Sequence, residues 1–244
     1  MRRTAIIAAL PGELKQLVQA GWIRYPGFAA PVQVWTKISG DQQWIAACAG
    51  MGKAAATRAF AAANAVGKLD AVLSVGWAGG LTGSCHAGQL LIPDVVVDSQ
   101  TGERFMLAEN GRNCILVTTP GVAGAQEKAR LASAYGACMV DMEAATVLRL
   151  AQGMGVPACC LKVITDDSTA NLPDLQRFID SNGQMQMAKF VGHVLLRPQY
   201  WKTLVQLGNA SSAASHPLAS AIYNILSNAS IDVNELNRTG VLPE

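Results

Sequence analysis

The sequence predicts an α/β fold in which a mixed central sheet is flanked by helices. Short apolar runs typical of buried strands alternate along the chain with segments of helical spacing, which favours a largely parallel or mixed sheet. Half of the 244 residues are hydrophobic and only 15% are charged, as expected for a sheet that is covered on both faces. The length allows one large domain with a substantial core, and the chain shows no internal repeat.

The first part of the chain predicts three strands and two helices. Thr4 to Leu10 is a continuous apolar run that ends at Pro-Gly, which is typical of a buried strand, and Glu13 to Ala20 has helical spacing. Val32 to Ile38 and Trp44 to Ala49 are strand-like on either side of a Ser-Gly-Asp turn, so we expect a hairpin. The glycine-rich stretch from Gly50 to Lys53 then opens an alanine-rich helix.

The central part continues the alternation of strands and helices. We expect strands at Ala71 to Val75, Gln89 to Val97, Cys114 to Thr118, Ala137 to Val140 and Ala158 to Ile164. Helical spacing predicts helices at Gln126 to Tyr135 and Glu143 to Gly153. One strand closes on Gly76-Trp77-Ala78-Gly79-Gly80 and another on Thr165-Asp166-Asp167. Because α/β enzymes place ligands just past the carboxyl ends of strands, both segments are candidate parts of a site.

The C-terminal part differs in composition. A long helix is expected from about Leu175 to Leu196, and after Arg197 the chain is rich in Ser, Ala and Asn. This tail contains two apolar helical candidates, Trp201 to Leu207 and Leu218 to Leu226. We therefore expect a main domain over residues 1–196 and a helical extension over residues 197–244 that packs on the same domain.

Charge and composition exclude several classes of protein. The net charge is +2 and no basic run occurs, which argues against a nucleic-acid partner. The six cysteines form no C-x-x-C pair and the three histidines are scattered, so we expect neither a metal site nor a cofactor. This cysteine usage suits a reducing cytoplasm. No stretch is long and apolar enough to span a bilayer, and the apolar start is too short for a signal peptide.

Three carboxylates stand at junctions between strands and helices. Each has an ordinary explanation: Glu13 is a first-turn carboxylate, Glu143 begins a helix, and Asp166 caps the segment after it. Together with the glycine-rich segment, these carboxylates fit a catalytic site better. The stretch from Gly50 to Lys53 resembles a phosphate-cradling loop, but it lacks the Walker spacing and a following Ser or Thr, which disfavours a nucleotide-dependent enzyme.

Five motifs occur in order between Thr4 and about Leu196. They are Ile6-Ile7-Ala8-Ala9-Leu10 with Glu13, Ala49-Gly50-Met51-Gly52-Lys53, Val75-Gly76-Trp77-Ala78-Gly79-Gly80-Leu81, Val140-Asp141-Met142-Glu143-Ala144 and Val163-Ile164-Thr165-Asp166. In this order they resemble the purine and uridine phosphorylase superfamily, and within it the methylthioadenosine/S-adenosylhomocysteine nucleosidases. The resemblance implies a nucleoside phosphorylase-like fold, with a mixed sheet that is partly closed into a barrel.

The resemblance also implies a role for each matching residue. Asp166 matches the aspartate that protonates the purine ring, and Glu13 matches the glutamate that activates water. Glu143 matches the glutamate that binds the ribose hydroxyls, and Met142 matches the methionine that packs on the sugar. Further substrate contacts are expected from Trp77, Ala78, Gly79, Ser168 and the segment Thr118 to Ala123.

The chemistry of the reaction is consistent with these roles. Breaking an N-glycosidic bond builds positive charge on the sugar and negative charge on the base, so an acid can protonate the base and a carboxylate can stabilise the sugar. Phosphorylases of the superfamily carry arginines where this chain has Ser74 and the Pro11 to Glu13 segment, and a serine where it has Trp77. A site without arginine is poorly equipped for phosphate, so we expect water as the nucleophile, with phosphate as the alternative.

Finer features predict a bulky substrate. The segment between Val97 and Asp141 is shorter than in the usual nucleosidases. Ile92 to Asp98 with the Gly102-Glu103-Arg104 turn, together with Arg197 to Leu207, resemble the hopanoid-associated phosphorylases, which are linked to removing adenine from adenosylhopane. The sequence therefore predicts cleavage of an adenine nucleoside with a large apolar 5′ group, by a homodimer or larger homo-oligomer. Alternatively, the apolar tail segments only pack on the core or form a subunit interface. A phosphorolytic enzyme and a non-catalytic nucleoside-binding protein on the same fold also stay open.

Overall fold

The computed structural model describes residues 1–19, 21–108, 113–168, 175–180, 183–184, 186, 189, 201–227 and 237, with the backbone alone given for 175–176, 201–207, 210 and 212. Eleven strands within these residues join in one sheet. They are β1 (Arg2–Ala8), β2 (Ile23–Arg24), β3 (Gln33–Ser39), β4 (Gln42–Cys48), β5 (Ala71–Gly80), β6 (Leu90–Leu91), β7 (Val95–Asp98), β8 (Arg104–Met106), β9 (Ile115–Thr118), β10 (Met139–Asp141) and β11 (Ala158–Asp166). The helices are α1 (Pro11–Leu14), α2 (Lys53–Val66), α3 (Ala125–Tyr135), α4 (Ala144–Gly153) and α6 (Trp201–Ser227), with a 3₁₀ turn, η1 (Leu175–Phe178).

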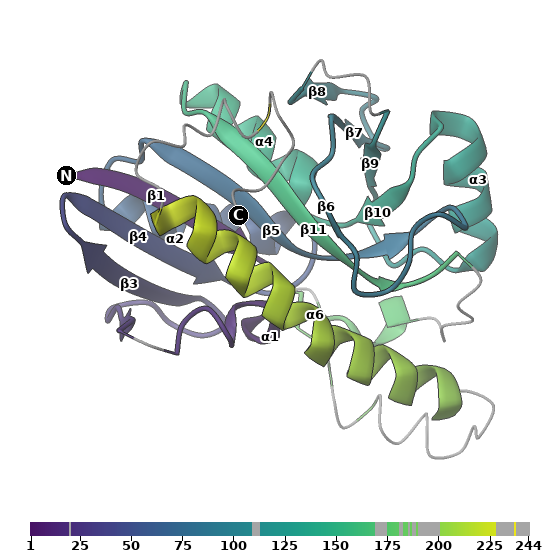
Figure 1. Ribbon diagram of the computed structural model, residues 1–244, viewed down its shortest axis with the longest axis horizontal. Helices are drawn as coiled ribbons and strands as arrows, with labels where there is room; N and C mark the ends of the chain where they lie inside the picture. Colours follow the sequence, from purple (N-terminus) through teal and green to yellow (C-terminus); the bar gives the residue numbers. More distant parts are fainter. Residues whose placement is uncertain are drawn as a thin grey trace.

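The sheet is mixed, as the sequence predicts. Its main path runs β2-β3-β4-β1-β5-β10-β9-β7-β8, and β11 pairs with β5 and β6. The pairs β1–β4, β1–β5, β5–β11, β7–β9 and β9–β10 are parallel, whereas β3–β4 is the expected antiparallel hairpin. Figure 1 shows the strands running through the centre of the molecule with helices around them, which confirms the predicted fold class.

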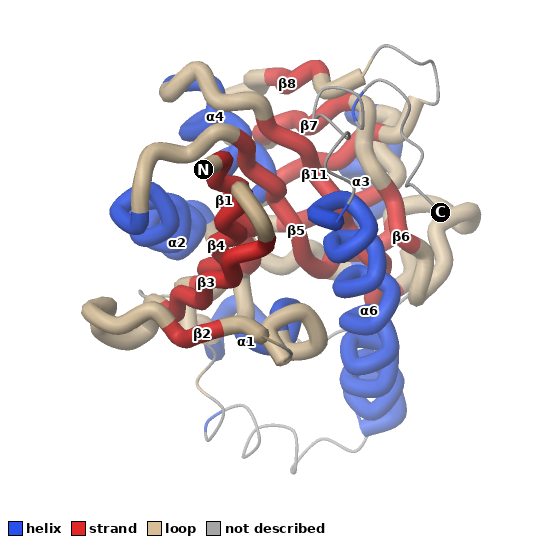
Figure 2. The backbone as a smooth tube through the Cα atoms, turned by 60° about the vertical axis from the view of Figure 1, so that its left-hand side comes forward, coloured by secondary structure: helices blue, strands red, loops and turns tan. Residues whose placement is uncertain are grey.

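Helices cover both faces of the central strands. Alternate residues of one strand point to opposite faces, so Ile6 and Leu73 belong to the core under α6, whereas Ile7 and Val72 belong to the core under α2 and α4. In Figure 2, α2 and α4 lie on one side of the strands and α6 lies on the other. Burial on both faces explains why these strands are continuous apolar runs rather than alternating patterns.

Strand β5 is longer than the sequence predicts. The expected strand ends at Val75, but β5 continues through the glycine-rich segment to Gly80. Its second half stays in register with β11, for example Trp77 with Val163, and then pairs antiparallel with β10. The predicted end of this strand at Val75 was wrong because the pairings with distant segments outweigh the turn preference of glycine.

Other predicted elements differ at their boundaries. The helix expected from Glu13 to Ala20 is only the four-residue α1, which begins at Pro11, and Ala20 lies outside the described residues. The strand expected from Gln89 to Val97 is split into β6 and β7. Of the helix expected from Leu175 to Leu196, only η1 and a few isolated residues are described, so most of that prediction lies outside the described residues.

The two helical candidates of the tail belong to one helix, α6, which continues through Pro217. Leu218, Ile222 and Ile225 are buried in the core beneath it. The Tyr223 hydroxyl donates to the carbonyl of Leu17 at 2.8 Å, which ties α6 to the segment after α1. Figure 1 shows α6 crossing one face of the sheet. None of the described helices has both the length and the apolar composition needed to cross a membrane.

Candidate active site

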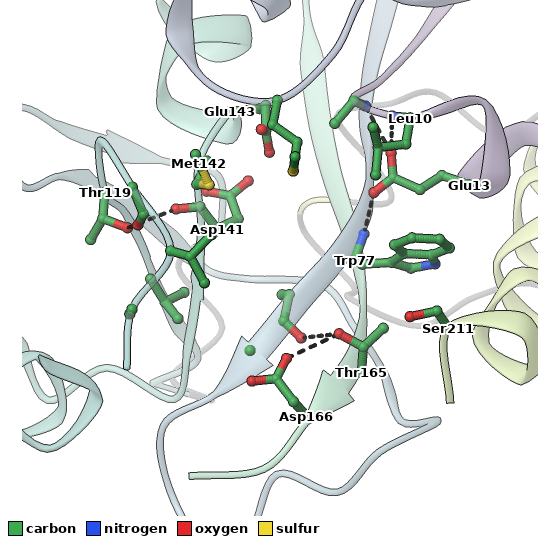
Figure 3. A pocket seen from close by; sticks show the side chains of 18 of the residues that line it. Leu10, Glu13, Trp77, Thr119, Asp141, Met142, Glu143, Thr165, Asp166 and Ser211 are labelled. Atoms are coloured by element: carbon green, nitrogen blue, oxygen red, sulfur yellow. Dashed lines mark hydrogen bonds between the residues drawn. The ribbon is translucent and has the colours of Figure 1, made fainter. Parts of the chain in front are cut away.

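A cavity of about 360 Å³ lies at the carboxyl ends of β1, β9, β10 and β11 and along the last residues of β5. This volume falls in the range of small-molecule sites. Its lining residues, contributed by segments far apart in the sequence, are Ala9, Leu10, Glu13, Met51, Trp77, Ala78, Gly79, Thr119, Gly121, Val122, Ala123, Lys128, Val140, Asp141, Met142, Glu143, Thr165, Asp166 and Ser211. Figure 3 shows Glu13, Trp77 and Ser211 on one side of this space and Asp141 and Met142 on the other.

The structure brings most of the sequence-predicted site residues together. Of the predicted residues, the following line the cavity: Glu13, Trp77, Ala78, Gly79, Met142, Glu143 and Asp166. Of the segment Thr118 to Ala123, from which further substrate contacts are expected, Thr119, Gly121, Val122 and Ala123 line the cavity as well. Ser168 is described but is not among the lining residues.

Glu13 is fixed by three backbone N–H groups. Its Oε2 accepts hydrogen bonds from the N–H groups of Ala9 and Leu10, both at 2.8 Å, and its Oε1 accepts one from Trp77 at 2.8 Å. The side chain therefore joins the end of β1 to the middle of β5. Burial raises the pKa of Glu13 above its ordinary value, although the N–H groups and the charge of Lys162 oppose the rise. A carboxylate with a raised pKa in a fixed position is suited to act as a general base.

Gly76 makes room for this carboxylate. A Cβ at position 76 would lie 2.6 Å from the Oε1 of Glu13, and the residue has a φ of +142°, which L side chains rarely adopt. Only glycine fits both conditions without strain. The glycine at position 76 is thus explained by the space that the Glu13 carboxylate needs, and not by a turn.

Glu143 lies at the junction between β10 and α4. Its Oε1 accepts a hydrogen bond from the N–H of Gly52 at 2.6 Å, so the Gly50 to Lys53 stretch binds a protein carboxylate. Burial raises the pKa of Glu143 to about 8, and the negative charge of Asp141 adds to the rise. Next to Met142 on the cavity wall, this side chain is placed to bind a hydroxyl group of a ligand.

A buried ion pair that the sequence reasoning missed involves Asp141, two residues before Glu143. The Nζ of Lys162 lies 2.8 Å from the Oδ2 of Asp141, and both side chains are buried. Burial alone would lower the pKa of Lys162, but the negative charges of Asp141, Cys160 and Glu143 and the hydrogen bond to Asp141 together outweigh burial, and the pKa is raised. A single lysine inside the apolar run of β11 was a signal in the sequence, since a buried charge requires a partner.

Asp166, at the end of β11, also has a cationic partner that the sequence reasoning missed. The Nζ of Lys128 on α3 donates a hydrogen bond to its Oδ2 and another to the carbonyl of Asp167 at 2.6 Å. The hydroxyl of Thr165 donates to the Oδ1 of Asp166 at 3.1 Å. In Figure 3, Asp166 and Thr165 lie below Trp77 at the lower end of the site.

Trp77 forms part of the wall near α6. A Cβ on Gly12 would lie 3.1 Å from the Trp77 ring, so the ring is packed closely against the start of α1. Its Nε1 is buried and has no hydrogen-bond partner among the described residues. The indole thus occupies space beside Glu13 on the cavity wall.

Within the described part of the chain, no three His, Cys, Asp or Glu side chains are grouped so that they could hold a metal ion. The cavity instead gathers four carboxylates, Glu13, Asp141, Glu143 and Asp166, each of which accepts hydrogen bonds from other groups. Such a site is equipped for proton transfer and for stabilising a cation.

The sequence model of the phosphorylase superfamily matches residues 3–121 and 112–195. The chain belongs to this superfamily. It is accordingly an enzyme of the nucleosidase or phosphorylase type. Among curated protein sequences, none matches this chain.

Several solved structures have a fold similar to that of this chain. The 5′-methylthioadenosine nucleosidase of Arabidopsis thaliana superposes with a TM-score of 0.70 at 16% identity, covering 97% of this chain and 99% of that one. The S-adenosylhomocysteine nucleosidase of Streptococcus pyogenes, in complex with 5-methylthiotubericidin, gives 0.69 at 16% identity, covering 94% and 98%. The futalosine hydrolase of Helicobacter pylori gives 0.64 at 17% identity, covering 90% and 96%. At these identities the similarity shows the fold.

Proposed function

We propose that this protein hydrolyses the N-glycosidic bond of a purine nucleoside. The observation that carries the proposal is that Glu13, Glu143 and Asp166 line one cavity of nucleoside-binding size, each held in place by a different element of the fold. Membership of the phosphorylase superfamily and the similarity to a nucleosidase and a futalosine hydrolase support the same reaction type.

The three carboxylates divide the work of one reaction. As the bond to the base breaks, its electron pair moves onto the purine, and Asp166 supplies the proton that neutralises the base. Glu143 holds the ribose hydroxyls and stabilises the cationic sugar. Glu13 takes a proton from the water molecule whose oxygen attacks C1′. Its raised pKa suits this role, since a general base works best when its pKa is close to the working pH.

Water fits this site better than phosphate. Lys128 is the one cationic side chain among the described lining residues, and it is paired with Asp166. Phosphate sites are usually equipped with arginines that bind oxygen atoms in pairs, and the cavity lining described here contains none.

We further propose adenine as the base and a bulky apolar group, such as the hopane of adenosylhopane, at the 5′ position. Ser211 on α6 lines the cavity, so the C-terminal helix is adjacent to the substrate space. Affinity should rise along a series of 5′-alkyl adenosines, because each buried CH₂ contributes roughly 0.8 kcal/mol. A flat series, or tightest binding of plain methylthioadenosine, would argue for a general nucleosidase.

The proposed function is tested with a panel of nucleosides assayed with and without phosphate, with base release followed by chromatography. We expect free base without added phosphate, and a loss of about a hundredfold or more in turnover for Asp166→Asn, the usual scale of acid catalysis. Asp41→Asn, the same change at an exposed position in the β3–β4 turn, is the matched control. Binding of nucleosides without any base release would favour the non-catalytic alternative.

A further inference from the structure

Lys128 is buried in a place where a lone charge would be strongly unfavourable. The residue is 1% exposed and lies in the first turn of α3, 38 positions before Asp166 in the sequence. Taking an ammonium group out of water is costly unless an opposite charge and hydrogen bonds replace the water. Two partners, the carboxylate of Asp166 and the carbonyl of Asp167, do so here.

The absence of a side chain at Gly79 allows this contact. A Cβ at that position would lie 3.2 Å from the Cε of Lys128, 3.3 Å from its Nζ and 3.3 Å from the Oδ2 of Asp166. These distances are shorter than nearly all Cβ contacts in proteins, so any larger residue would press on the pair. Gly79, Lys128 and Asp166 therefore form one packed group on the cavity wall.

Both carboxylate oxygens of Asp166 accept hydrogen bonds in this arrangement. Lys128 donates to Oδ2 and the Thr165 hydroxyl donates to Oδ1. The contact between Lys128 and Asp166 is an ion pair, in which an ammonium group meets a carboxylate. A proton available to a ligand is therefore held on the ammonium of Lys128.

We propose that Lys128 positions Asp166 and supplies the proton that Asp166 passes to the departing base. This inference rests on the proposed function. As the bond between C1′ and the base nitrogen breaks, its electrons move onto the purine, a ring nitrogen takes a proton from Asp166, and Asp166 takes one from Lys128. The water oxygen bonds to C1′ and its proton goes to Glu13. Lys128 is then a neutral amine and Glu13 an acid, and exchange with solvent after product release restores both.

The pairing of Lys128 with Asp166 also reduces electrostatic repulsion between Asp166 and the departing base. A lone carboxylate beside a base that is gaining negative charge would raise the barrier by repulsion. With Lys128 in contact, the two side chains together carry no net charge, so the base can gain electrons next to them. Lys128 thereby acts on the reaction through Asp166.

The test is a double-mutant cycle with Lys128→Met, Asp166→Asn and the combined variant, measured on a purine nucleoside that the wild-type protein cleaves. We expect Lys128→Met to lower kcat by about a hundredfold with little change in KM, because a proton donor acts in the transition state. The combined variant should be no slower than Asp166→Asn alone, since residues that act as a unit do not add. Lys68→Met, at an exposed lysine after α2, is the matched control.

A second substrate distinguishes a role of Lys128 in supplying the proton from a purely structural role of Lys128. Turnover of 4-nitrophenyl riboside, whose leaving group departs as a stable anion, should stay within a few-fold of wild type in Lys128→Met and also shows that the variant folds. Near-normal purine release by Lys128→Met, or losses that multiply in the combined variant, would overturn the role of Lys128 and leave the proposed function intact. If the wild-type protein releases no base from any nucleoside, the proposed function itself fails.

Discussion

The substitution Gly76→Ala tests whether the position of Glu13 matters for the reaction. The added Cβ would lie 2.6 Å from the Oε1 of Glu13, whereas ordinary contact begins at 3.4 Å, so the carboxylate must shift by about 0.8 Å. Glu13 has little freedom to move, because it accepts three hydrogen bonds of 2.8 Å from the N–H groups of Ala9, Leu10 and Trp77. Misplacement of a reacting group by about 1 Å costs about a hundredfold in rate.

We therefore expect kcat/KM for base release to fall by about a hundredfold in Gly76→Ala. The φ of +142° adds strain of about 1–3 kcal/mol, which should lower the Tm by several degrees. Gly83→Ala is the matched control, since nothing lies within 4 Å of a Cβ there. Activity of Gly76→Ala within threefold of wild type would contradict a role for the position of Glu13. So would an equal loss of activity when Glu13→Gln is made in Gly76→Ala and in the wild-type protein.

Three further predictions concern stability. Glu143 has an ordinary pKa of 4.5 and a folded pKa of about 8, so the stability linked to its protonation is complete below pH 4.5 and is lost as the pH rises to about 8. The free energy of unfolding of Glu143→Gln in urea should therefore rise relative to that of wild type across this range, by about 4–5 kcal/mol at pH 8, since one pKa unit corresponds to about 1.4 kcal/mol; a constant difference would contradict the raised pKa. Lys162→Met leaves Asp141 buried without its ion-pair partner and should lower the free energy of unfolding by about 3–5 kcal/mol. Adding Asp141→Leu to Lys162→Met should restore part of this loss. Ile222→Ala removes a fully buried side chain of α6 and should cost about 2–5 kcal/mol, whereas less than 1 kcal/mol would show that α6 does not pack as described.

The sequence was informative where a charged side chain stands at the end of an apolar strand. Glu13 and Glu143 follow apolar strands and Asp166 ends one, and a carboxylate at such a junction stands out from the buried residues before it. The edge of a largely parallel sheet then brings these junctions together, so three distant residues could be placed in one cavity before any coordinates were known.

The features that could not be predicted depend on contacts between distant segments. Lys128 looks like an ordinary surface lysine in a helix with mixed polarity, and only the tertiary structure shows that it reaches Asp166. Pro217 indicates a break in the tail, yet α6 continues through it because Leu218 and Ile222 are buried on the sheet. In each case packing outweighs the local preference.

The most direct measurement of the central claim follows the oxygen atom that reaches the sugar. The purified protein is incubated with a purine nucleoside in ¹⁸O-labelled water without phosphate, and the products are examined by mass spectrometry. We predict free purine together with a sugar that carries one ¹⁸O at C1, and loss of both products in Asp166→Asn. A sugar that appears only as an unlabelled 1-phosphate when phosphate is added, or the absence of base release from every nucleoside offered, would contradict hydrolysis at this site.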